Sequence, residues 1–502
     1  MIDMTLLQIA DVVGGELSDV TREQAANIRV TGTVEFDSRA VTPGGLFLAL
    51  PGAHSDGHDF AASAVASGAA AVLAARPVGV PAIVVKPLEA DADSNAGVLE
   101  YDTDGSGAAV LGALARLAAA VAAELVAGGL TIIGVTGSSG KTSTKDLLAA
   151  VLAPLGDVVA PPGSFNNELG HPWTVLRATT ETDFLILEMS ARHPGNIAAL
   201  AAIAPPTIAV VLNVGTAHLG EFGSREVIAA TKAELPQAVP ASGVVILNAD
   251  DAAVAAMADV TAARVVRVAR SPGADVWADD VELDELARPR FTLHAEPFGE
   301  RKAGQTAVAL AVHGDHQVSN ALCAAAVALE CGADLDGVAA ALAAAGPVSR
   351  HRMAVSTRAD GVTIINDAYN ANPDSVRAGL KALAWMATSK AGERRRSWAV
   401  LGEMAELGDD AIAEHDSIGR LAVRLDVSRL VVVGTGRSLS AMQKGAVMEG
   451  SWGSEVTAVA DADAALALLR GELRDGDVVL VKASNAAGLG KLADALARDA
   501  AQ

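Results

Sequence analysis

The sequence has little cysteine. Among its 502 residues there are 2 cysteines, Cys323 and Cys331. They lie eight positions apart in a helical pattern, which separates them by about 12 Å along the helix axis. That separation is beyond the reach of a disulfide. We therefore expect free thiols and a reduced, cytoplasmic compartment.

Positive charge is also scarce. Lys and Arg number 38 against 60 Asp and Glu, so the net charge is −22. A protein that holds DNA, RNA or anionic lipid on a broad basic surface needs the opposite balance. We therefore expect no nucleic-acid partner, although one local basic pocket is compatible with this charge.

Signals for secretion and membrane insertion are missing. The N-terminal residues MIDMTLLQIADVV contain neither the basic segment nor the cleavage site of a signal peptide. The most apolar long stretch, residues 111–127, carries Arg116 and Glu124. It is too short and too charged for a membrane span, so we expect none.

Aromatic residues make up only 3% of the chain, whereas apolar residues of all kinds make up 51%. The cores must then consist of Ala, Val and Leu, which suits helices packed closely on parallel strands. At about 150 residues per domain, the length predicts three domains. The fold class that we predict is α/β.

The pattern of strands and helices divides the chain into three parts. We expect a small α/β domain over residues 1–107, whose acidic stretch 89–107 is a linker. A central domain with a parallel, mononucleotide-binding sheet follows over 108–346. A doubly wound, Rossmann-like domain occupies 347–502.

Short apolar runs predict the strands. They are 47–50 and 83–85 in the first domain, 130–135, 184–187, 208–212, 244–247 and 265–268 in the second, and 362–365, 398–401, 430–433, 456–459 and 478–481 in the third. Helices are expected at 60–67, from residue 108 onward, and as one Ala-rich run over 318–345. The less regular residues 275–312 favour antiparallel pairing.

A phosphate-binding loop directly follows the strand at 130–135. Its sequence is TGSSGKT, composed of Thr136, Gly137, Ser138, Ser139, Gly140, Lys141 and Thr142. The glycines let backbone N–H groups turn inward, the lysine reaches β- and γ-phosphates, and the threonine hydroxyl ligates Mg²⁺. Val135 stands where the usual motif has its first glycine, so an ordinary Gly/Ser turn is the alternative. The context of strand, loop and helix favours a nucleoside triphosphate site.

Three further residues are candidates for the same site. Glu188 ends a strand, at the edge where open α/β sheets bind ligands, and is a candidate Mg²⁺ ligand. His218 lies in a Gly-rich loop and is a candidate metal ligand. Lys232 lies in a predicted helix. The alternatives are a surface carboxylate, a surface histidine and a solvated lysine.

Two other patterns carry less weight. The residues His54, Asp56, His58 and Asp59 match no common metal-site spacing. VVVGTGRS at 431–438 lacks the third glycine of a dinucleotide-binding loop, so we interpret it as an ordinary turn between strand and helix. Neither the base-reading N-K-x-D motif nor the D-x-x-G switch of GTPases stands where the strands would place it.

Several motifs together resemble the Mur ligase family in order and spacing. They are TGSSGKTS, SFNNELGHP (164–172), ILEMSARHPGNI (186–197), LNVGTAHLGEFGS (212–224), GDHQVSNALCAAAVAL (314–329), NDAYNANPDS (366–375) and LGEMAELG (401–408). DSR (37–39) and the segment 43–60 are similar to the UDP-binding domain of the family. The resemblance covers nearly the whole chain.

The resemblance implies a ligase that uses ATP to form an amide bond through an acyl phosphate, in peptidoglycan synthesis. It is strongest to the branch that joins D-alanyl-D-alanine to UDP-N-acetylmuramoyl-tripeptide, acting as a monomer with two Mg²⁺ ions. The branch that adds the third amino acid is an alternative, but the chain lacks its D-N-P-x-R signature. A non-catalytic homologue that retains ATP is a second alternative, against which the complete set of candidate residues argues.

The resemblance also assigns roles to individual residues. Lys141, Glu188, His218 and Lys232 would be catalytic, with Thr142, Glu188, His218 and a carbamylated Lys232 around the metals. Asn320, Arg352 and Asp367 would contact the nucleotide. The substrate-binding residues would be Ser38, Arg39, Asn166, Asn167, Tyr369, Asn370, Asn372, Pro373 and Lys482.

The chain departs from the family pattern near its C-terminus. The family often has Lys-Gly-Ser-Arg, whereas this chain has Lys482, Ala483, Ser484 and Asn485. The arginine that would make a charge-assisted contact to substrate is absent. Lys482 is then expected to act without it.

Overall fold

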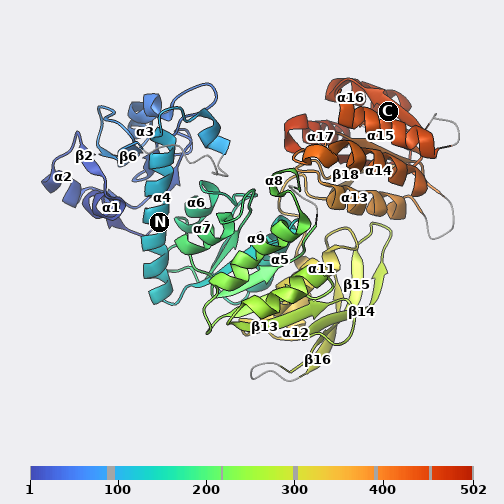
Figure 1. The fold of residues 1–502 in the computed structure, drawn as a ribbon, viewed down its shortest axis with the longest axis horizontal. Helices are drawn as coiled ribbons and strands as arrows, with labels where there is room; N and C mark the ends of the chain where they lie inside the picture. Colours follow the sequence, from blue (N-terminus) through green and yellow to red (C-terminus); the bar gives the residue numbers. More distant parts are fainter. Residues whose placement is uncertain are drawn as a thin grey trace.

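The computed structural model describes residues 2–87, 97–215, 219–297, 303–388, 394–450 and 455–499. They form three lobes that follow one another in chain order, with the N- and C-terminal lobes both facing the central one (Figure 1). Each lobe contains a sheet covered by helices. The predicted α/β class is confirmed.

The first lobe is built on a five-stranded sheet in the order β2-β7-β6-β5-β4, beside a small pair β1-β3. Its strands are β1 (Met4–Thr5), β2 (Glu16–Ser18), β3 (Arg29–Val30), β4 (Val34–Glu35), β5 (Leu46–Leu48), β6 (Ala71–Ala74) and β7 (Ala82–Val84), and its helices are α1 (Leu6–Val13), α2 (Arg22–Asn27) and α3 (Ala61–Ala66). The predicted strands at 47–50 and 83–85 and the helix at 60–67 are confirmed, each shifted slightly at its ends.

The predicted linker over 89–107 needs correction where it is described. Residues 88–96 lie outside the described part of the chain. Residues 97–101 form a 3-10 helix, and helix α4 (Ser106–Ala127) already includes the last two residues of the expected linker. Because this stretch is acidic and rich in glycine, the sequence predicted neither the 3-10 helix at 97–101 nor the early start of α4.

Helix α4 corrects a second expectation. It spans 22 residues and is long and apolar enough, by length and composition alone, to cross a membrane, although just over half of its most apolar window is buried inside the protein. Leu114, Leu117 and Val121 on its buried face belong to a hydrophobic core that includes residues of both the first and the central lobe. The stretch 111–127 judged from the sequence is only part of this helix, so the argument from its length does not apply to the whole of α4.

The central lobe contains a nine-stranded sheet in the order β16-β15-β14-β13-β12-β11-β8-β10-β9. The strands are β8 (Thr131–Thr136), β9 (Val158–Val159), β10 (Phe184–Glu188), β11 (Ile208–Val211), β12 (Val244–Asn248), β13 (Arg264–Ala269), β14 (Val276–Leu283), β15 (Pro289–Ala295) and β16 (Gly304–Ala309). Pairing is parallel from β9 to β14 and antiparallel from β14 to β16. The five predicted strands and the antiparallel region are confirmed.

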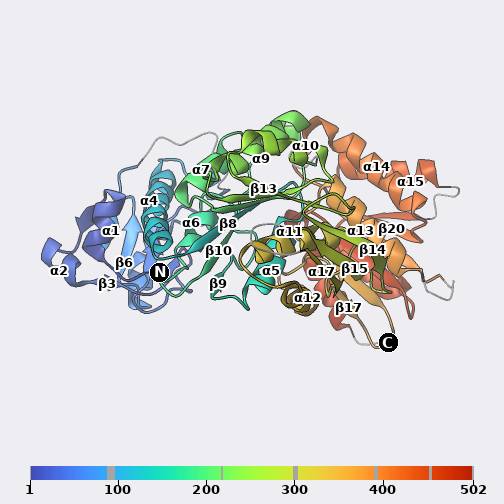
Figure 2. The same cartoon turned by 90° about the horizontal axis from the view of Figure 1, so that it is seen from below.

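Helices cover both faces of this sheet (Figure 2). They are α5 (Lys141–Leu152), α6 (Gly170–Val175), α7 (Asn196–Ile203), α8 (Leu219–Phe222), α9 (Arg225–Ala238), α10 (Ala252–Ala255), α11 (Gln317–Glu330) and α12 (Leu335–Ala344). Alternate side chains of β8 point to opposite faces: Ile132 packs with α7 and α9, and Ile133 with α5 and α11. The predicted single helix over 318–345 is wrong, because Gly332, at a φ of 97°, separates α11 from α12.

The third lobe is a doubly wound sheet in the order β17-β18-β22-β19-β20-β21. Its elements are β17 (Ala354–Thr357), β18 (Thr363–Asn366), α13 (Pro373–Met386), β19 (Ser397–Leu401), α14 (Ala411–Arg424), β20 (Arg429–Val433), α15 (Arg437–Glu449), β21 (Val456–Val459), α16 (Ala462–Glu472), β22 (Val478–Lys482) and α17 (Leu489–Arg498). Helices α13, α14 and α15 pack on one face, and α16 and α17 on the other. All five predicted strands are confirmed.

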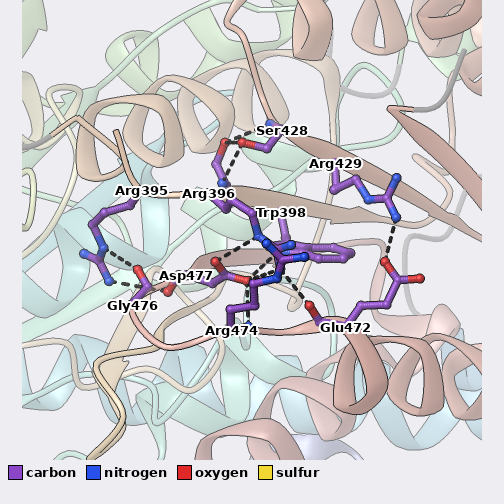
Figure 3. Close-up of polar contacts among 10 residues, drawn as sticks. Arg395, Arg396, Trp398, Ser428, Arg429, Glu472, Arg474, Gly476 and Asp477 are labelled. Atoms are coloured by element: carbon purple, nitrogen blue, oxygen red, sulfur yellow. Dashed lines mark hydrogen bonds and ion pairs between the residues drawn. The ribbon is translucent and has the colours of Figure 1, made fainter. Parts of the chain in front are cut away.

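A buried carboxylate, Asp477, lies at the amino ends of two interior strands of this sheet, β19 and β22 (Figure 3). Asp477 accepts hydrogen bonds from Arg396 Nη2 at 2.6 Å, Trp398 Nε1 at 2.9 Å and the Arg474 N–H at 3.0 Å. Arg395 next to it donates to the Gly476 carbonyl. These contacts tie the start of β19 to the start of β22.

We predict that Asp477→Ala destabilises the C-terminal lobe by about 3 kcal/mol, because it leaves buried donors without an acceptor. Urea unfolding followed by tryptophan fluorescence measures this loss. Asp499→Ala, which breaks an ion pair with the exposed Arg470, is the control and should cost much less. Equal losses in the two variants would contradict this role of Asp477.

Candidate active site

The carboxyl ends of the central and C-terminal sheets face one another across a cavity of about 1220 Å³. The central sheet contributes the ends of β8, β10, β11 and β12, and helix α11 adds its first turns. The C-terminal lobe contributes the segments after β18, β19 and β22. Open α/β sheets bind ligands at the carboxyl ends of their strands. Here the carboxyl ends of two sheets line the same cavity.

The predicted phosphate-binding loop lines this cavity from Ser138 to Thr142. Gly140 has a φ of 85°, and a Cβ there would lie 2.7 Å from Asn320 Oδ1. Only glycine suits that backbone and that space. The loop therefore brings Asn320, a predicted nucleotide contact on α11, against its own backbone. Thr136 lies at the end of β8 beneath the loop and donates to the Met189 carbonyl.

Asn213 and one of the loop's own residues, Lys141, hold the phosphate-binding loop in shape. Asn213, just after β11, accepts from the Ser138 N–H through its backbone carbonyl at 3.1 Å and from the Ser139 N–H through its side chain at 3.0 Å. Lys141 Nζ folds back to donate to the Gly137 carbonyl at 2.7 Å. Desolvation lowers the pKa of Lys141, and an arriving phosphate would favour its charged form.

Glu188 lies within reach of the same loop and is 1% exposed. Its Oε2 accepts from Thr142 Oγ1 at 3.3 Å, while its Oε1 has no hydrogen-bond partner. Burial raises the pKa of Glu188, and the positive charge of Lys141 opposes that shift. A buried carboxylate oxygen without a partner, beside a hydroxyl, suits a Mg²⁺ ion. The residues present therefore fit one metal of the predicted pair.

Lys232 on α9 is 6% exposed, so it is not the solvated lysine of the simpler interpretation. Burial and the nearby Lys141 lower the pKa of Lys232 to about 7. Within the described ranges it forms no ion pair, and it does not line the cavity. His218, the remaining predicted metal ligand, lies outside the described residues.

Arg352 reaches from the C-terminal lobe to the phosphate-binding loop. Its Nη2 donates to Ser164 Oγ at 2.9 Å and to Thr142 Oγ1 at 3.3 Å. The guanidinium stacks over the ring of Tyr369, 4.2 Å from its centroid, and its buried Nε has no hydrogen-bond partner. The structure thus brings two predicted site residues of the third lobe to the predicted nucleotide site.

Lys482 and Asp367 form a buried pair on the C-terminal wall. Lys482 Nζ donates to Asp367 Oδ2 at 2.5 Å and to the Asn370 carbonyl at 3.0 Å. Burial lowers the pKa of Lys482, against the opposing effect of Asp367. Lys482 therefore fixes the loop after β18, besides lining the cavity.

The predicted substrate-binding asparagines have different local roles. Asn166 Nδ2 donates to Glu188 Oε2 at 3.4 Å, which links it to the predicted metal ligand. Asn167 accepts from the Gly170 N–H at the start of α6, and Asn372 caps the start of α13. These three side chains and Asn370 line the cavity, whereas Pro373, the first residue of α13, does not.

Ser38 and Arg39 lie in the first lobe, away from this cavity. Arg39 is exposed and pairs with Asp37 through two hydrogen bonds. The first lobe is joined to the central one nearby, where Trp173 Nε1 donates to the Val34 carbonyl at 2.8 Å. The structure therefore does not bring these two predicted residues together with the phosphate-binding loop.

Sequence reasoning missed two charged groups beside the cavity. Lys145 on α5 is buried, pairs with Asp146 and donates to Ser349 Oγ at 3.3 Å, so the phosphate-loop helix holds the segment between the lobes. Arg192 pairs with Glu406 across the lobes. A charged residue on an otherwise apolar helix face was the only available signal for Lys145, and Arg192 had none.

Comparisons with known proteins match all three lobes. The models described as Mur ligase family, catalytic domain, as Mur ligase middle domain, and as Mur ligase, glutamate ligase domain match residues 32–120, 135–328 and 351–485. A UDP-N-acetylmuramoyl-tripeptide–D-alanyl-D-alanine ligase of Mycobacterium tuberculosis is 76% identical, over 99% of this chain and 98% of that one. A protein of the same name from Escherichia coli is 34% identical, over 86% of each chain.

Solved structures agree with these sequence matches. A crystal structure of MurF from Acinetobacter baumannii has a TM-score of 0.80 at 28% identity and covers 99% of both chains. A MurF ligase from Thermotoga maritima in complex with ADP has a TM-score of 0.73 at 27% identity, over 93% of this chain and 98% of that one. The resemblance found in the motifs is confirmed, and the chain belongs to the Mur ligase family.

Proposed function

We propose that this chain is an ATP-dependent ligase that joins D-alanyl-D-alanine to UDP-N-acetylmuramoyl-tripeptide, a step in making peptidoglycan precursors. The observation that carries the proposal is the partnerless carboxylate oxygen of Glu188 beside the phosphate-binding loop, inside a cavity walled by two lobes. The relatives at 76% and 34% identity bear the name of this activity. The ADP-bound structural neighbour supports the use of ATP.

The first chemical step joins two anions. A carboxylate oxygen of the tripeptide attacks the γ-phosphorus of ATP, the bond to the bridging oxygen breaks, and ADP leaves with an acyl phosphate left behind. Lys141 and Arg352 supply positive charge where the two anions meet. Thr142 and Glu188 would hold Mg²⁺, which when bound neutralises phosphate charge.

The second step forms the amide. The amine of the dipeptide attacks the acyl carbon, phosphate leaves from the tetrahedral intermediate, and the nitrogen loses a proton. Tyr369, Asn370 and Asn372 line the C-terminal side of the cavity, and we assign them to the dipeptide. Asn166, in contact with Glu188, faces the tripeptide carboxylate in this arrangement.

We assign one substrate to each part of the chain. Residues 1–107 take the UDP moiety through Ser38 and Arg39, residues 108–346 take ATP, and 347–502 take the dipeptide. Asn320 contacts the adenine, and Arg352 and Asp367 close over the phosphates and ribose. The enzyme acts as a cytoplasmic monomer in this proposal, without nucleic-acid or membrane partners.

A second metal site is completed by Lys232 in carbamylated form together with His218. An uncharged lysine amine adds to CO₂, forming a carbamate and releasing one proton, so a neutral buried amine becomes an anion. Burial supports this assignment, because a lysine with a lowered pKa is uncharged for much of the time near neutral pH. A carbamate also provides the oxygen atoms that Mg²⁺ prefers.

We expect phosphate release to require all three substrates. With ATP and UDP-N-acetylmuramoyl-tripeptide alone, release should stay below about one hundredth of the complete rate, since the acyl phosphate lacks its amine. A coupled phosphate assay with and without D-alanyl-D-alanine measures this. Release independent of the dipeptide would contradict the assignment, and release driven by a single amino acid would favour the alternative branch.

The carbamate predicts a specific signal. Protein equilibrated with ¹³C-labelled bicarbonate should show one additional carbonyl resonance that grows as the pH rises through about 7, where Lys232 loses its proton. Lys232→Arg should lack the resonance, because arginine stays charged. An identical spectrum for the two proteins would exclude carbamylation of Lys232.

A further inference from the structure

An ion pair between two lobes lies on the wall of the cavity. Arg192 lies in the loop after β10, and Glu406 in the loop after β19. Arg192 Nη2 lies 2.9 Å from Glu406 Oε1, and its Nε lies 3.8 Å from Glu221 Oε1 on α8. Arg192 and Glu406 line the cavity and are about one-third exposed. The guanidinium therefore bridges a carboxylate of each lobe at the edge of the ligand space.

The two backbones also touch beside this pair. A Cβ added to Gly220 on α8 would lie 2.4 Å from the Gly408 nitrogen and 2.6 Å from its Cα. Gly408 has a φ of 54°, and it begins a 3-10 helix at 408–410. No side chain fits between these glycines. The close approach exists only while the lobes are together.

The central and C-terminal lobes are also joined at the β14–β15 hairpin, where the contacts differ from those at Arg192. Ala287, at the tip of the β14–β15 hairpin, is fully buried in the core of the C-terminal lobe. Trp385 on α13 donates to the Asp284 carbonyl of the same tip at 2.8 Å. Separation there would expose apolar surface, whereas separation at Arg192 breaks polar contacts that water replaces. The lobes are thus joined firmly at the hairpin and reversibly at Arg192.

Both ends of the ion pair connect to the candidate active site. Next to Glu406, the Ala405 N–H donates to Ser484 Oγ at 3.0 Å, two residues from Lys482. Near Arg192, Ser190 Oγ donates to the Asn166 carbonyl at 2.9 Å. Closing this contact therefore sets the distance between the two walls that carry Lys482 and Asn166.

We propose that Arg192, Glu406 and the Gly220–Gly408 contact form a latch that holds the C-terminal lobe closed over the ligands. Arg192 and Glu406 are positioning residues, because they act through the loops that they join. The catalytic consequence rests on the proposed ligase function, but the closure itself does not. A partly exposed ion pair contributes little to stability, which lets the latch release product in each cycle.

Charge exchange tests the latch. Arg192→Glu places a like charge against Glu406 and Glu221, so it should lower kcat/KM for the dipeptide about tenfold. It should also raise the radius of gyration measured by X-ray scattering with Mg²⁺ and a non-hydrolysable ATP analogue. The double variant Arg192→Glu/Glu406→Arg should recover the wild-type radius and return kcat/KM to within about threefold. A purely structural role would not be rescued by the exchange.

A second variant disturbs the Gly220–Gly408 contact of the latch without changing any charge. Gly220→Ala forces the two backbones apart and should produce the same pair of losses. Gly471→Ala, in open space on α16, and the exchange of Arg470 and Asp499, paired within one lobe, are the controls and should change neither readout.

The outcomes decide between the two claims. The latch is overturned if Arg192→Glu and Gly220→Ala both keep the wild-type radius of gyration. It is also overturned if the double variant Arg192→Glu/Glu406→Arg does not restore that radius. If the unaltered protein forms no amide while the scattering series behaves as expected, the proposed ligase function fails and the latch stands.

Discussion

The interaction on which the site depends is the meeting of the buried Glu188 carboxylate with the phosphate-binding loop. A carboxylate with an unpaired oxygen is costly to bury, and here it lies beside Lys141 and Thr142 at the end of parallel strands. Such an arrangement is stable only with positive charge close by. The unpaired oxygen favours a ligand-binding role for this site, since most buried carboxylate oxygens have a hydrogen-bond partner.

The net charge of −22 contrasts with the positive charge gathered at this site. The proposed substrates carry phosphates and carboxylates, so the overall field repels them. Lys141, Arg352 and the proposed metals must act over a few ångströms in a partly desolvated cavity, where charge interactions are strong. The net charge therefore argues against a broad nucleic-acid surface, but it carries no information about the pocket.

The sequence was informative where structure is local. Strand positions followed from apolar runs, and the phosphate-binding loop followed from glycine and lysine spacing, because both depend on neighbours along the chain. The division of residues 318–345 into two helices was missed because alanine favours helix so strongly that one glycine, Gly332, did not register as an end. The ordered turns at 97–107 were hidden for the opposite reason, since their composition is that of a loop.

Contacts between lobes were beyond the reach of the sequence. Arg192 and Glu406 are 214 residues apart, and Lys145 meets Ser349 only because the chain returns to α5 after building a sheet. The family resemblance predicted several residues that line the cavity, but it did not show that Asn167, Asn372 and Lys482 also hold the backbone that forms it. Those roles come from packing of whole lobes.

If Glu188 holds the metal that accompanies the nucleotide, Mg²⁺ and nucleotide should bind cooperatively and this side chain should be needed for it. Calorimetric titration of ADP with and without Mg²⁺, in the unaltered protein and in Glu188→Gln, tests it most directly. Mg²⁺ should strengthen ADP binding at least about tenfold in the unaltered protein. In Glu188→Gln, Mg²⁺ should strengthen ADP binding by less than about threefold. Without Mg²⁺, the variant should bind ADP at least as tightly as the unaltered protein, because a buried negative charge near the phosphates is gone. An equal effect of Mg²⁺ in both proteins would contradict it.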